Sequence, residues 1–308
     1  MSSAPHDAGS LKAQATAKFK TARAAGLTHS LGPWALPRLR WHFGAWLGLT
    51  ILAALLIVAA SAGWFYPGDP LDIVGRPSLW PGVDPHFALG TDMMGRNMAA
   101  GMAHGARISL AVGAAAALIT VLVGTAIGAV AGYFGGVVDD LAMRITEMFQ
   151  TMPSFLFTVV LVVVFGSSLP VITLAIGATS WPQVARLVRA EAMRVRETDF
   201  VRAATTMGVG HLRMLRTHII PNSLAPVIVL TSILIGQAIL VEASLSFLGL
   251  GDPAVVSWGT MVATGRPLLR TAWYMTALPG AAIFVSVMSF MLLGNWLNDR
   301  LNPRDSSH

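Results

Sequence analysis

The chain of 308 residues contains no cysteine and little charge. The absence of cysteine excludes disulfide bonds, zinc–thiolate sites and a cysteine nucleophile, and it leaves the redox compartment open. Only 12% of the residues are charged, whereas a soluble domain usually carries about 25%. So few charged side chains cannot cover a water-facing surface, which argues against a soluble globular protein.

Long apolar blocks take the place of the missing charge. Hydrophobic residues make up 54% of the chain, and they gather in stretches of about the length that crosses a bilayer as a helix. The pattern predicts an all-α membrane protein with about six transmembrane helices. The predicted spans cover residues 44–65, 107–133, 145–166, 169–186, 222–245 and 275–297, and Gly166-Ser167-Ser168 forms a tight turn between the third and fourth.

The cationic side chains predict how the spans are oriented. Six spans that start from a cytoplasmic amino terminus leave five of the 21 Lys and Arg residues outside, namely Arg76, Arg96, Arg107, Arg266 and Arg270. The others fall in inside segments 1–43, 134–144, 187–221 and 298–308, with Arg186 at the inner end of its span. Cytoplasmic loops are enriched in Lys and Arg, so both termini are expected in the cytoplasm.

The spans divide the chain into a tail and a membrane domain. Residues 1–43 form a basic cytoplasmic tail, which is either a helix lying on the membrane surface or disordered. Residues 44–308 form the transmembrane domain, with a proline-rich loop outside the membrane at 66–106 and a long inside loop at 187–221. The net charge of +6 is spread between apolar blocks, which favours anionic membrane lipid over nucleic acid as a partner.

Glycines recur every fourth residue along the second predicted span, at Gly124, Gly128, Gly132 and Gly136. On a helix this spacing places them on one face, where another backbone can approach closely. We expect them to form a tight helix–helix contact, within the chain or between subunits. Gly135 and Gly136 are expected to end the helix, leaving Asp139 and Asp140 in water.

The inside loop contains a short amphipathic helix. Thr198 or Asp199 can cap a helix over 200–207, and Gly208 suits the left-handed position that ends it. The side chains expected on its apolar side are Phe200, Val201, Ala203, Ala204 and Met207. A second helix follows from about His211, and Pro221 marks the return to the membrane. Such a segment fits either a groove on a soluble partner or the lipid surface.

Two further motifs bear on chemistry. Residues 90–97 resemble a phosphate-binding loop, but Arg96 and Asn97 stand where Lys and Ser or Thr are required. No other such motif occurs, so any use of ATP belongs to a partner chain. Glu242, near the end of the fifth span, is expected to anchor the re-entrant segment 244–251, with a proton or metal role as the alternative. The histidines lack a metal-ligand spacing, and no metal site or catalytic residue is predicted.

The inside loop also resembles a known motif. Ala203-Ala204, Gly208 and the run His218-Ile219-Ile220-Pro221-Asn222 look like the EAA loop of ABC importer permeases. That resemblance implies a coupling helix that sits in a cleft of the ATPase subunit. The residues assigned to this coupling loop are Asp199, Phe200, Val201, Arg202, Ala203, Ala204, Met207, Gly208, Arg213 and Pro221. Arg202 replaces the glutamate that usually opens the motif, which leaves open the ATPase residue that it contacts.

Other stretches narrow the resemblance to the second, C-type permease of dipeptide, oligopeptide and nickel importers. They are Leu89-Gly90-Thr91-Asp92 with Gly95-Arg96, Gly105-Ala106-Arg107, Gly132–Gly136 with Asp139, Glu242–Gly251, Ser257-Trp258-Gly259 and Leu301-Asn302-Pro303-Arg304. The resemblance covers about residues 40–305 and implies a type I importer fold in the bacterial inner membrane. It also implies a homologous second permease, two ATPase subunits that bind ATP and Mg, and an extracytoplasmic solute-binding protein.

Two other classes of membrane protein fit the sequence less well. An intramembrane enzyme would need paired acids, a His and Ser set or metal ligands within its spans. A proton-driven secondary transporter would show internal repeats, and none is clear in this sequence. The solute is left open among peptides, chelated nickel and similar small molecules.

Overall fold

The computed structural model describes residues 37–301, with side chains from Phe43 onward. This part of the chain is helical, and its only β pairing consists of two isolated bridges, Ile73 with Arg96 and Thr91 with Asn97. The all-α prediction is confirmed. The basic tail predicted for 1–43 lies almost wholly outside the described residues, although a helix already begins at Pro37.

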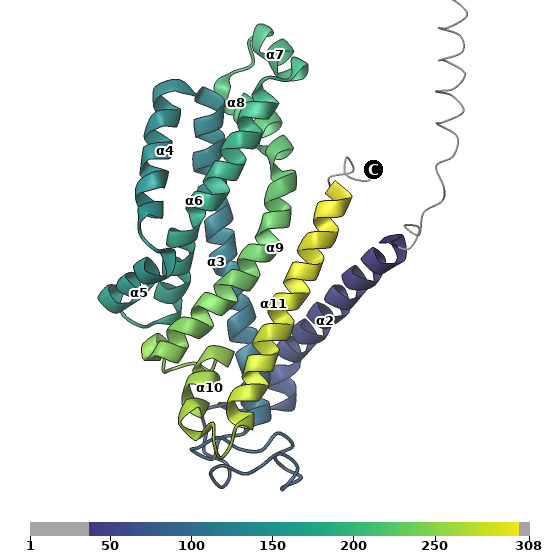
Figure 1. Ribbon diagram of the computed structural model, residues 1–308, viewed down its shortest axis with the longest axis vertical. Helices are drawn as coiled ribbons and strands as arrows, with labels where there is room; N and C mark the ends of the chain where they lie inside the picture. The colour runs from purple at the N-terminus through teal and green to yellow at the C-terminus, as the bar shows by residue number, and fades with distance from the viewer. Residues whose placement is uncertain (1–36, 302–308) are drawn as a thin grey trace, which may run out of the picture. The chain divides into compact units, whose positions relative to one another are not determined.

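Ten α-helices and three short helical turns follow one another in residues 37–301 (Figure 1). They are α2 (Pro37–Phe65), α3 (Met98–Phe134), α4 (Gly136–Thr151), α5 (Ser154–Phe165), α6 (Leu169–Arg196), α7 (Asp199–Thr206), α8 (His211–Met214), the π-turn η2 (Leu215–Ile219), α9 (Ile220–Leu245), the π-turn η3 (Ser246–Leu250), α10 (Trp258–Gly265), the 3-10 turn η4 (Arg266–Leu268) and α11 (Tyr274–Leu301). In the unit that starts at Gly44, α7 and α10 lie at opposite ends. We call these the α7 end and the α10 end.

Each predicted span coincides with helical structure. Four helices are long and apolar enough to cross a membrane: Phe43–Phe65, Met98–Phe134, His211–Leu250 and Tyr274–Leu301. The pair α4 and α5 adds a fifth candidate. The fourth predicted span, 169–186, lies in α6, whose last ten residues carry several charges and extend the helix beyond the predicted end at 186.

The third predicted span is wrong as a single straight helix. Residues 145–166 fall on α4 and α5, which meet at an angle of 83°. Pro153 has no backbone N–H and disfavours helical geometry at the residue before it. Met152 accordingly adopts an extended conformation, with φ −90° and ψ 136°. The segment 134–144, expected as an inside loop, belongs mainly to α4.

Side-chain packing binds these helices into one core. Near the α7 end, α3, α6, α7 and α9 share a cluster that includes Val188, Val201 and Met214. Near the α10 end, Trp258 and Tyr274 belong to a second buried cluster. Helices α3 and α9 contribute to both clusters, and α6 packs with them in the cluster at the α7 end and in a third cluster that includes Ile172.

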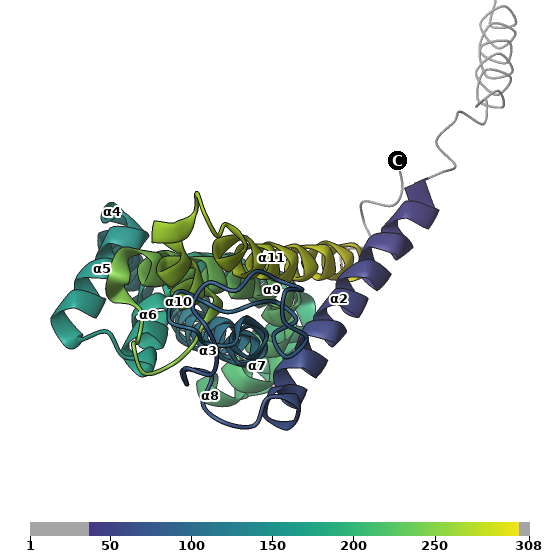
Figure 2. The same cartoon turned by 90° about the horizontal axis from the view of Figure 1, so that it is seen from below.

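The loop of residues 66–97 is ordered at the α10 end. The Tyr274 hydroxyl donates to the backbone oxygens of Leu79 at 2.7 Å and Thr91 at 2.8 Å, which fixes the loop to α11. Figure 2 looks onto this loop from the α10 end. The predicted loop extended to 106, but α3 begins at Met98 because Asn97 caps it by accepting from the N–H of Ala99.

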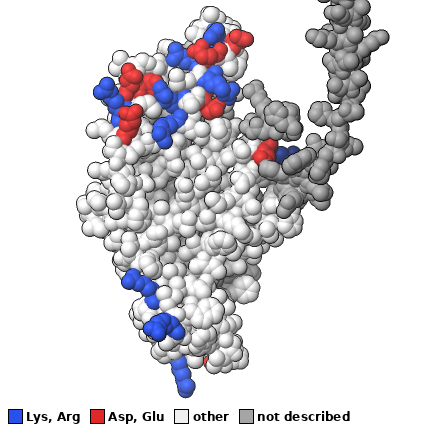
Figure 3. Space-filling model, viewed as in Figure 1, with Lys and Arg blue, Asp and Glu red and all other residues white. Residues whose placement is uncertain are grey.

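Charged side chains separate into the two ends of the unit. Figure 3 shows acidic and basic groups together at the α7 end, a few basic groups near the α10 end and an uncharged band between them on this face. A band without charge is what the hydrocarbon layer of a membrane requires. The distribution agrees with a multi-pass membrane protein.

Candidate functional site

The segment from α7 to α8 projects from the α7 end (Figure 1). Asp199 opens α7 after Thr198, whose hydroxyl donates to the Val195 carbonyl and makes no cap bond. Gly208 adopts φ +78°, and the N–H of Val209 bonds back to the Ala204 oxygen at 3.2 Å. This left-handed glycine ends the helix as the sequence indicates.

The predicted apolar side of α7 divides into two faces. Val201 and Ala204 are buried in the cluster that holds Met214. The side chains of Phe200 and Met207 face outward, with 48% and 76% of their surface exposed. Ala203 is also exposed. One face therefore holds α7 to the membrane domain, and the other leaves apolar side chains in solvent.

We call Phe200, Met207 and Leu212 the apolar knob. Leu212 lies on α8 and is 68% exposed. Large exposed apolar side chains that stand close together are typical of contact surfaces for another protein or a membrane. The knob thus offers a small apolar contact surface at the α7 end, where charged side chains also gather.

Basic side chains surround the knob. Arg202 pairs with Glu197 at 2.6 Å, and this hydrogen bond lowers the pKa of Glu197 and raises the pKa of Arg202. Both groups are exposed, so the pair is worth little to stability. Arg213 and Arg216 line a shallow groove on the α8 side. These guanidinium groups remain accessible to a carboxylate of a partner.

Pro221, which is expected to mark the return to the membrane, lies at the start of α9, and the chain is helical on both sides of it. Residues 211–245 form a continuous helical run through α8, η2 and α9, and Pro221 lies in the first turn of α9. The proline lacks an N–H and its ring crowds the preceding turn, and the wider π-turn at Leu215–Ile219 accommodates it. Leu212 of the knob is therefore joined directly to the span α9, whereas α7 is connected to it through residues 207–210.

Three of the four predicted glycines pack α3 against α6. A Cβ at Gly124 would lie 2.5 Å from the Val184 Cβ, and one at Gly132 would lie 2.6 Å from the Arg189 oxygen. Gly128 contacts α6 between them. Gly136 does not belong to this contact: it has φ +52°, and nothing lies within 4 Å of its Cβ position, because the break at Gly135 turns α4 away.

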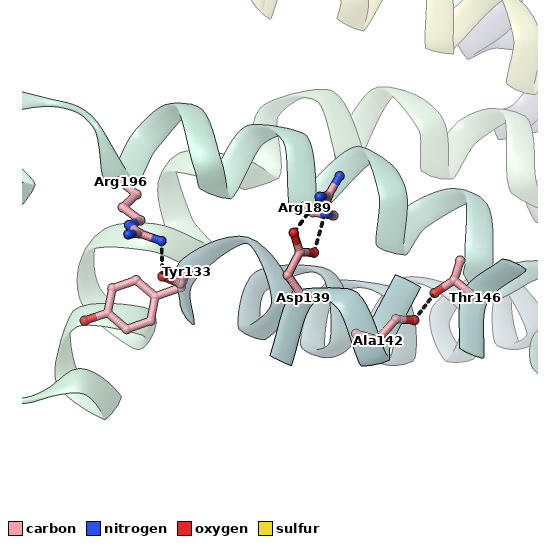
Figure 4. A network of polar contacts seen from close by, with 6 residues as sticks. All are labelled: Tyr133, Asp139, Ala142, Thr146, Arg189 and Arg196. Atoms are coloured by element: carbon pink, nitrogen blue, oxygen red, sulfur yellow. Dashed lines mark hydrogen bonds and ion pairs between the residues drawn. The ribbon is translucent and has the colours of Figure 1, made fainter. Parts of the chain in front are cut away.

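Asp139 corrects a second expectation, since it is buried and not in water. Its carboxylate accepts two hydrogen bonds from the Arg189 guanidinium, which joins α4 to α6 (Figure 4). Arg196, further along α6, donates to the Tyr133 oxygen at 3.0 Å. These bonds fix the direction of α4 after the glycine break. The sequence shows an aspartate shortly after Gly135 and Gly136. Its partner Arg189 could not be predicted, because it lies 50 residues away along the chain.

Glu242 lies buried where α9 meets the re-entrant segment. Its Oε1 accepts from the hydroxyls of Ser246 at 2.9 Å and Ser257 at 2.7 Å. Ser257 in turn caps α10 by accepting from the N–H of Thr260. Gly259 packs closely against this group, since a Cβ there would lie 3.2 Å from Oε1. In residues 37–301 no three acidic or histidine side chains gather to hold a metal.

We expect Glu242→Leu to loosen the α10 end, because it leaves two buried hydroxyls without their acceptor. Each such loss costs about 1–3 kcal/mol. Glu242→Gln keeps an acceptor oxygen and should retain most of the stability. Limited proteolysis of the loop 66–97 and α10 in the purified protein measures the difference. Equal cleavage of the Leu and Gln variants would contradict the anchoring role.

The comparisons with known proteins agree with this arrangement. A family model described as the binding-protein-dependent transport system inner membrane component matches residues 124–306. The di/tripeptide transport system permease protein of Pseudomonas aeruginosa is 36% identical over 267 residues, which cover 85% of this chain and 88% of the relative. The oligopeptide transport system permease protein of Haemophilus influenzae is 37% identical over 259 residues, 83% of each chain.

A third relative has a different solute in its name. The glutathione transport system permease protein of Pectobacterium atrosepticum is 34% identical over 267 residues, which cover 86% of this chain and 88% of the relative. Each of these three relatives matches 83% or more of the chain. The chain therefore belongs to the family of binding-protein-dependent transport system inner membrane components, and it is a transmembrane permease subunit of an ABC importer whose ATPase activity resides in separate subunits.

Proposed function

We propose that this permease subunit forms one half of a pore for small peptides in the bacterial inner membrane. A homologous second permease supplies the other half, two ATPase subunits bind ATP and Mg, and an extracytoplasmic protein delivers the solute. Peptides are favoured because relatives over most of the chain are named for di/tripeptide, oligopeptide and glutathione transport. The chain itself catalyses no covalent step.

The α7 end is proposed to face the cytoplasm, with both termini on that side. This orientation puts most of the Lys and Arg residues inside, as the positive-inside rule requires. The loop 66–97 and α10 then face the binding protein. In this arrangement the apolar knob lies on the ATP side of the membrane.

The single observation that carries the proposal is the division of α7 into a buried face and an exposed face. The ATPase subunit receives Phe200 and Met207 in a groove, while Val201 keeps α7 attached to the membrane domain. When ATP closes the two ATPases, the knob moves with them and the spans shift between inward-open and outward-open states. The segment would couple ATP use to transport.

The double variant Phe200→Ala/Met207→Ala is expected to lower solute-stimulated ATPase activity by about tenfold or more. Removing two apolar anchors from a protein contact typically costs at least about 2 kcal/mol, and about 1.4 kcal/mol corresponds to tenfold. Both side chains are exposed, so the fold should be unchanged. The measurement is ATPase activity of the complete transporter in proteoliposomes, with and without loaded binding protein.

Thr206→Ala is the matched control. It lies on the same helix and is exposed, but its hydroxyl bonds only to the Ala203 oxygen of its own helix. It should keep normal stimulation. If the double variant also keeps normal stimulation, the knob does not receive force from the ATPases. Contact of the knob with the lipid surface would then be the better explanation, and a fluorescent probe attached at position 207 of the reconstituted permease would test it.

A further inference from the structure

Every glutamine in the described part of the chain lines the same cavity. Gln150 comes from the end of α4, Gln183 from α6 and Gln237 from α9. The cavity has a volume of about 690 Å³, which falls within the range of small-molecule sites. Glutamine side chains from three helices thus converge on one space.

The lining of this cavity is polar but uncharged. No acidic, basic or histidine side chain contributes to it among the described residues. Hydroxyl groups add to the three amides, and the remaining lining is apolar. The hydroxyl-bearing residues are Thr120, Ser154, Thr179 and Ser180. Such a cavity offers hydrogen bonds without favouring either sign of charge.

The three amides have no hydrogen-bond partner of their own within residues 37–301. The side-chain hydrogen bonds of this region use other groups, such as Thr158 and Thr179, which bond to each other at 2.9 Å. Gln183 and Gln237 lie near the middle of α6 and α9. A polar group at membrane depth is costly unless it is paired or faces water. These amides are therefore free to bond to water or to a partner from outside the chain.

The helix break borders the same cavity. Met152 and Pro153, where α4 and α5 meet, belong to its lining. Non-helical backbone at membrane depth occurs where it is buried in protein or lines a water-filled space. In secondary transporters, interrupted helices at membrane depth form solute sites, which shows that such a break can serve this role. The helix break and the three amides thus lie at the same cavity.

We infer that this cavity contacts the solute in transit and that Gln150, Gln183 and Gln237 recognise it through neutral peptide groups. The inference rests on the proposed function and adds the solute chemistry. A carboxamide carries both a donor and an acceptor, so it pairs with the C=O and N–H of a peptide bond. Since the lining has no charge, it does not select among peptide side chains, and recognition follows the backbone common to all peptides.

The test compares tri-alanine with a depsipeptide analogue in which an ester oxygen replaces one peptide N–H. The complete transporter in proteoliposomes, with its binding protein, takes up each compound. The double variant Gln183→Leu/Gln237→Leu should lower tri-alanine uptake by about three- to tenfold for each amide removed. Uptake of the analogue should fall less, because it makes fewer hydrogen bonds to the glutamines. The ratio of tri-alanine uptake to analogue uptake should therefore be smaller in the double variant than in wild type.

A second variant keeps the test decisive if the double variant assembles poorly. Gln237→Glu retains the shape of the side chain but adds a negative charge. It should favour a tripeptide with a central lysine over tri-alanine, a preference that the wild-type chain lacks. Thr173→Val is the matched control on α6, since its hydroxyl bonds to the Leu169 oxygen of its own helix. It should leave both preferences unchanged.

The binding protein is identical in every assay, so its own preference cancels when variants are compared. Equal loss of tri-alanine and analogue uptake in the double variant, or no charge preference in Gln237→Glu, would overturn the inference. The cavity would then be filled by the second permease. Failure of the proposed function is distinguishable, because the wild-type transporter itself would then take up neither tripeptide.

Discussion

Gly128→Leu is expected to prevent the transporter from accumulating in the membrane. At this position α3 and α6 meet so closely that even a Cβ would overlap the Ala185 oxygen and lie 2.9 Å from the Val188 Cβ. Overpacking a core costs about 1–3 kcal/mol and sometimes more, and here the obstructing atoms include backbone that cannot rotate away. The helices would have to separate along their whole contact.

The measurement is the amount of complex that copurifies with its ATPase subunits, which should fall to less than about a tenth of wild type. That change corresponds to about 1.4 kcal/mol. Gly128→Ala and Gly280→Ala form a matched pair, because nothing lies within 4 Å of a Cβ at Gly280 on α11. Alanine should destabilise at 128 and be neutral or stabilising at 280. Normal accumulation of Gly128→Leu would contradict the packing of α3 on α6.

Asp139→Ala is expected to cause the second largest loss. The carboxylate is buried at 11% side-chain exposure, and its partner Arg189 is 34% exposed. Breaking a fully buried pair costs about 3–5 kcal/mol. Because water reaches part of Arg189, we expect about 2–3 kcal/mol here. Thermal inactivation of the detergent-purified complex should occur at a clearly lower temperature.

Two further variants separate the ion pair from a general effect of removing charge. Asp140→Ala removes the neighbouring acid, which is exposed, and should change stability by less than about 0.5 kcal/mol. Asp139→Leu/Arg189→Met removes both members of the pair and should recover much of the stability lost in Asp139→Ala, because no buried charge remains unpaired. Equal destabilisation by Asp139→Ala and Asp140→Ala would refute the role of the pair.

Much of the fold could be predicted because a membrane span has a simple sequence signature. Length and apolarity place α2, α3, α9 and α11, and Gly166-Ser167-Ser168 gives the turn between α5 and α6. The break at Met152 was missed although Pro153 was visible. Apolar residues continue on both sides of the break, so the mean hydropathy of the segment does not reveal that the chain changes direction there.

Less of the candidate site could be predicted, since contacts between distant segments set it. The pattern of α7 shows apolar residues at 200, 201, 204 and 207, but only packing against Met214 decides that Val201 and Ala204 point inward. The burial of Asp139 likewise depends on Arg189, a partner on another helix. The convergence of the glutamines could not be predicted, because Gln150, Gln183 and Gln237 are far apart in the sequence and share no motif.

The continuous helical run from His211 to Leu245 has a mechanical consequence. At about 1.5 Å per residue, its α8, η2 and α9 parts together reach roughly 50 Å, well over the ~30 Å thickness of the hydrocarbon layer. Such a rod acts as a lever. A sideways push on its protruding end is delivered to Gln237 and Glu242 without passing through a flexible joint. Tilting about a fulcrum in the bilayer would swing its two ends in opposite directions, so that one side of the pathway narrows as the other widens.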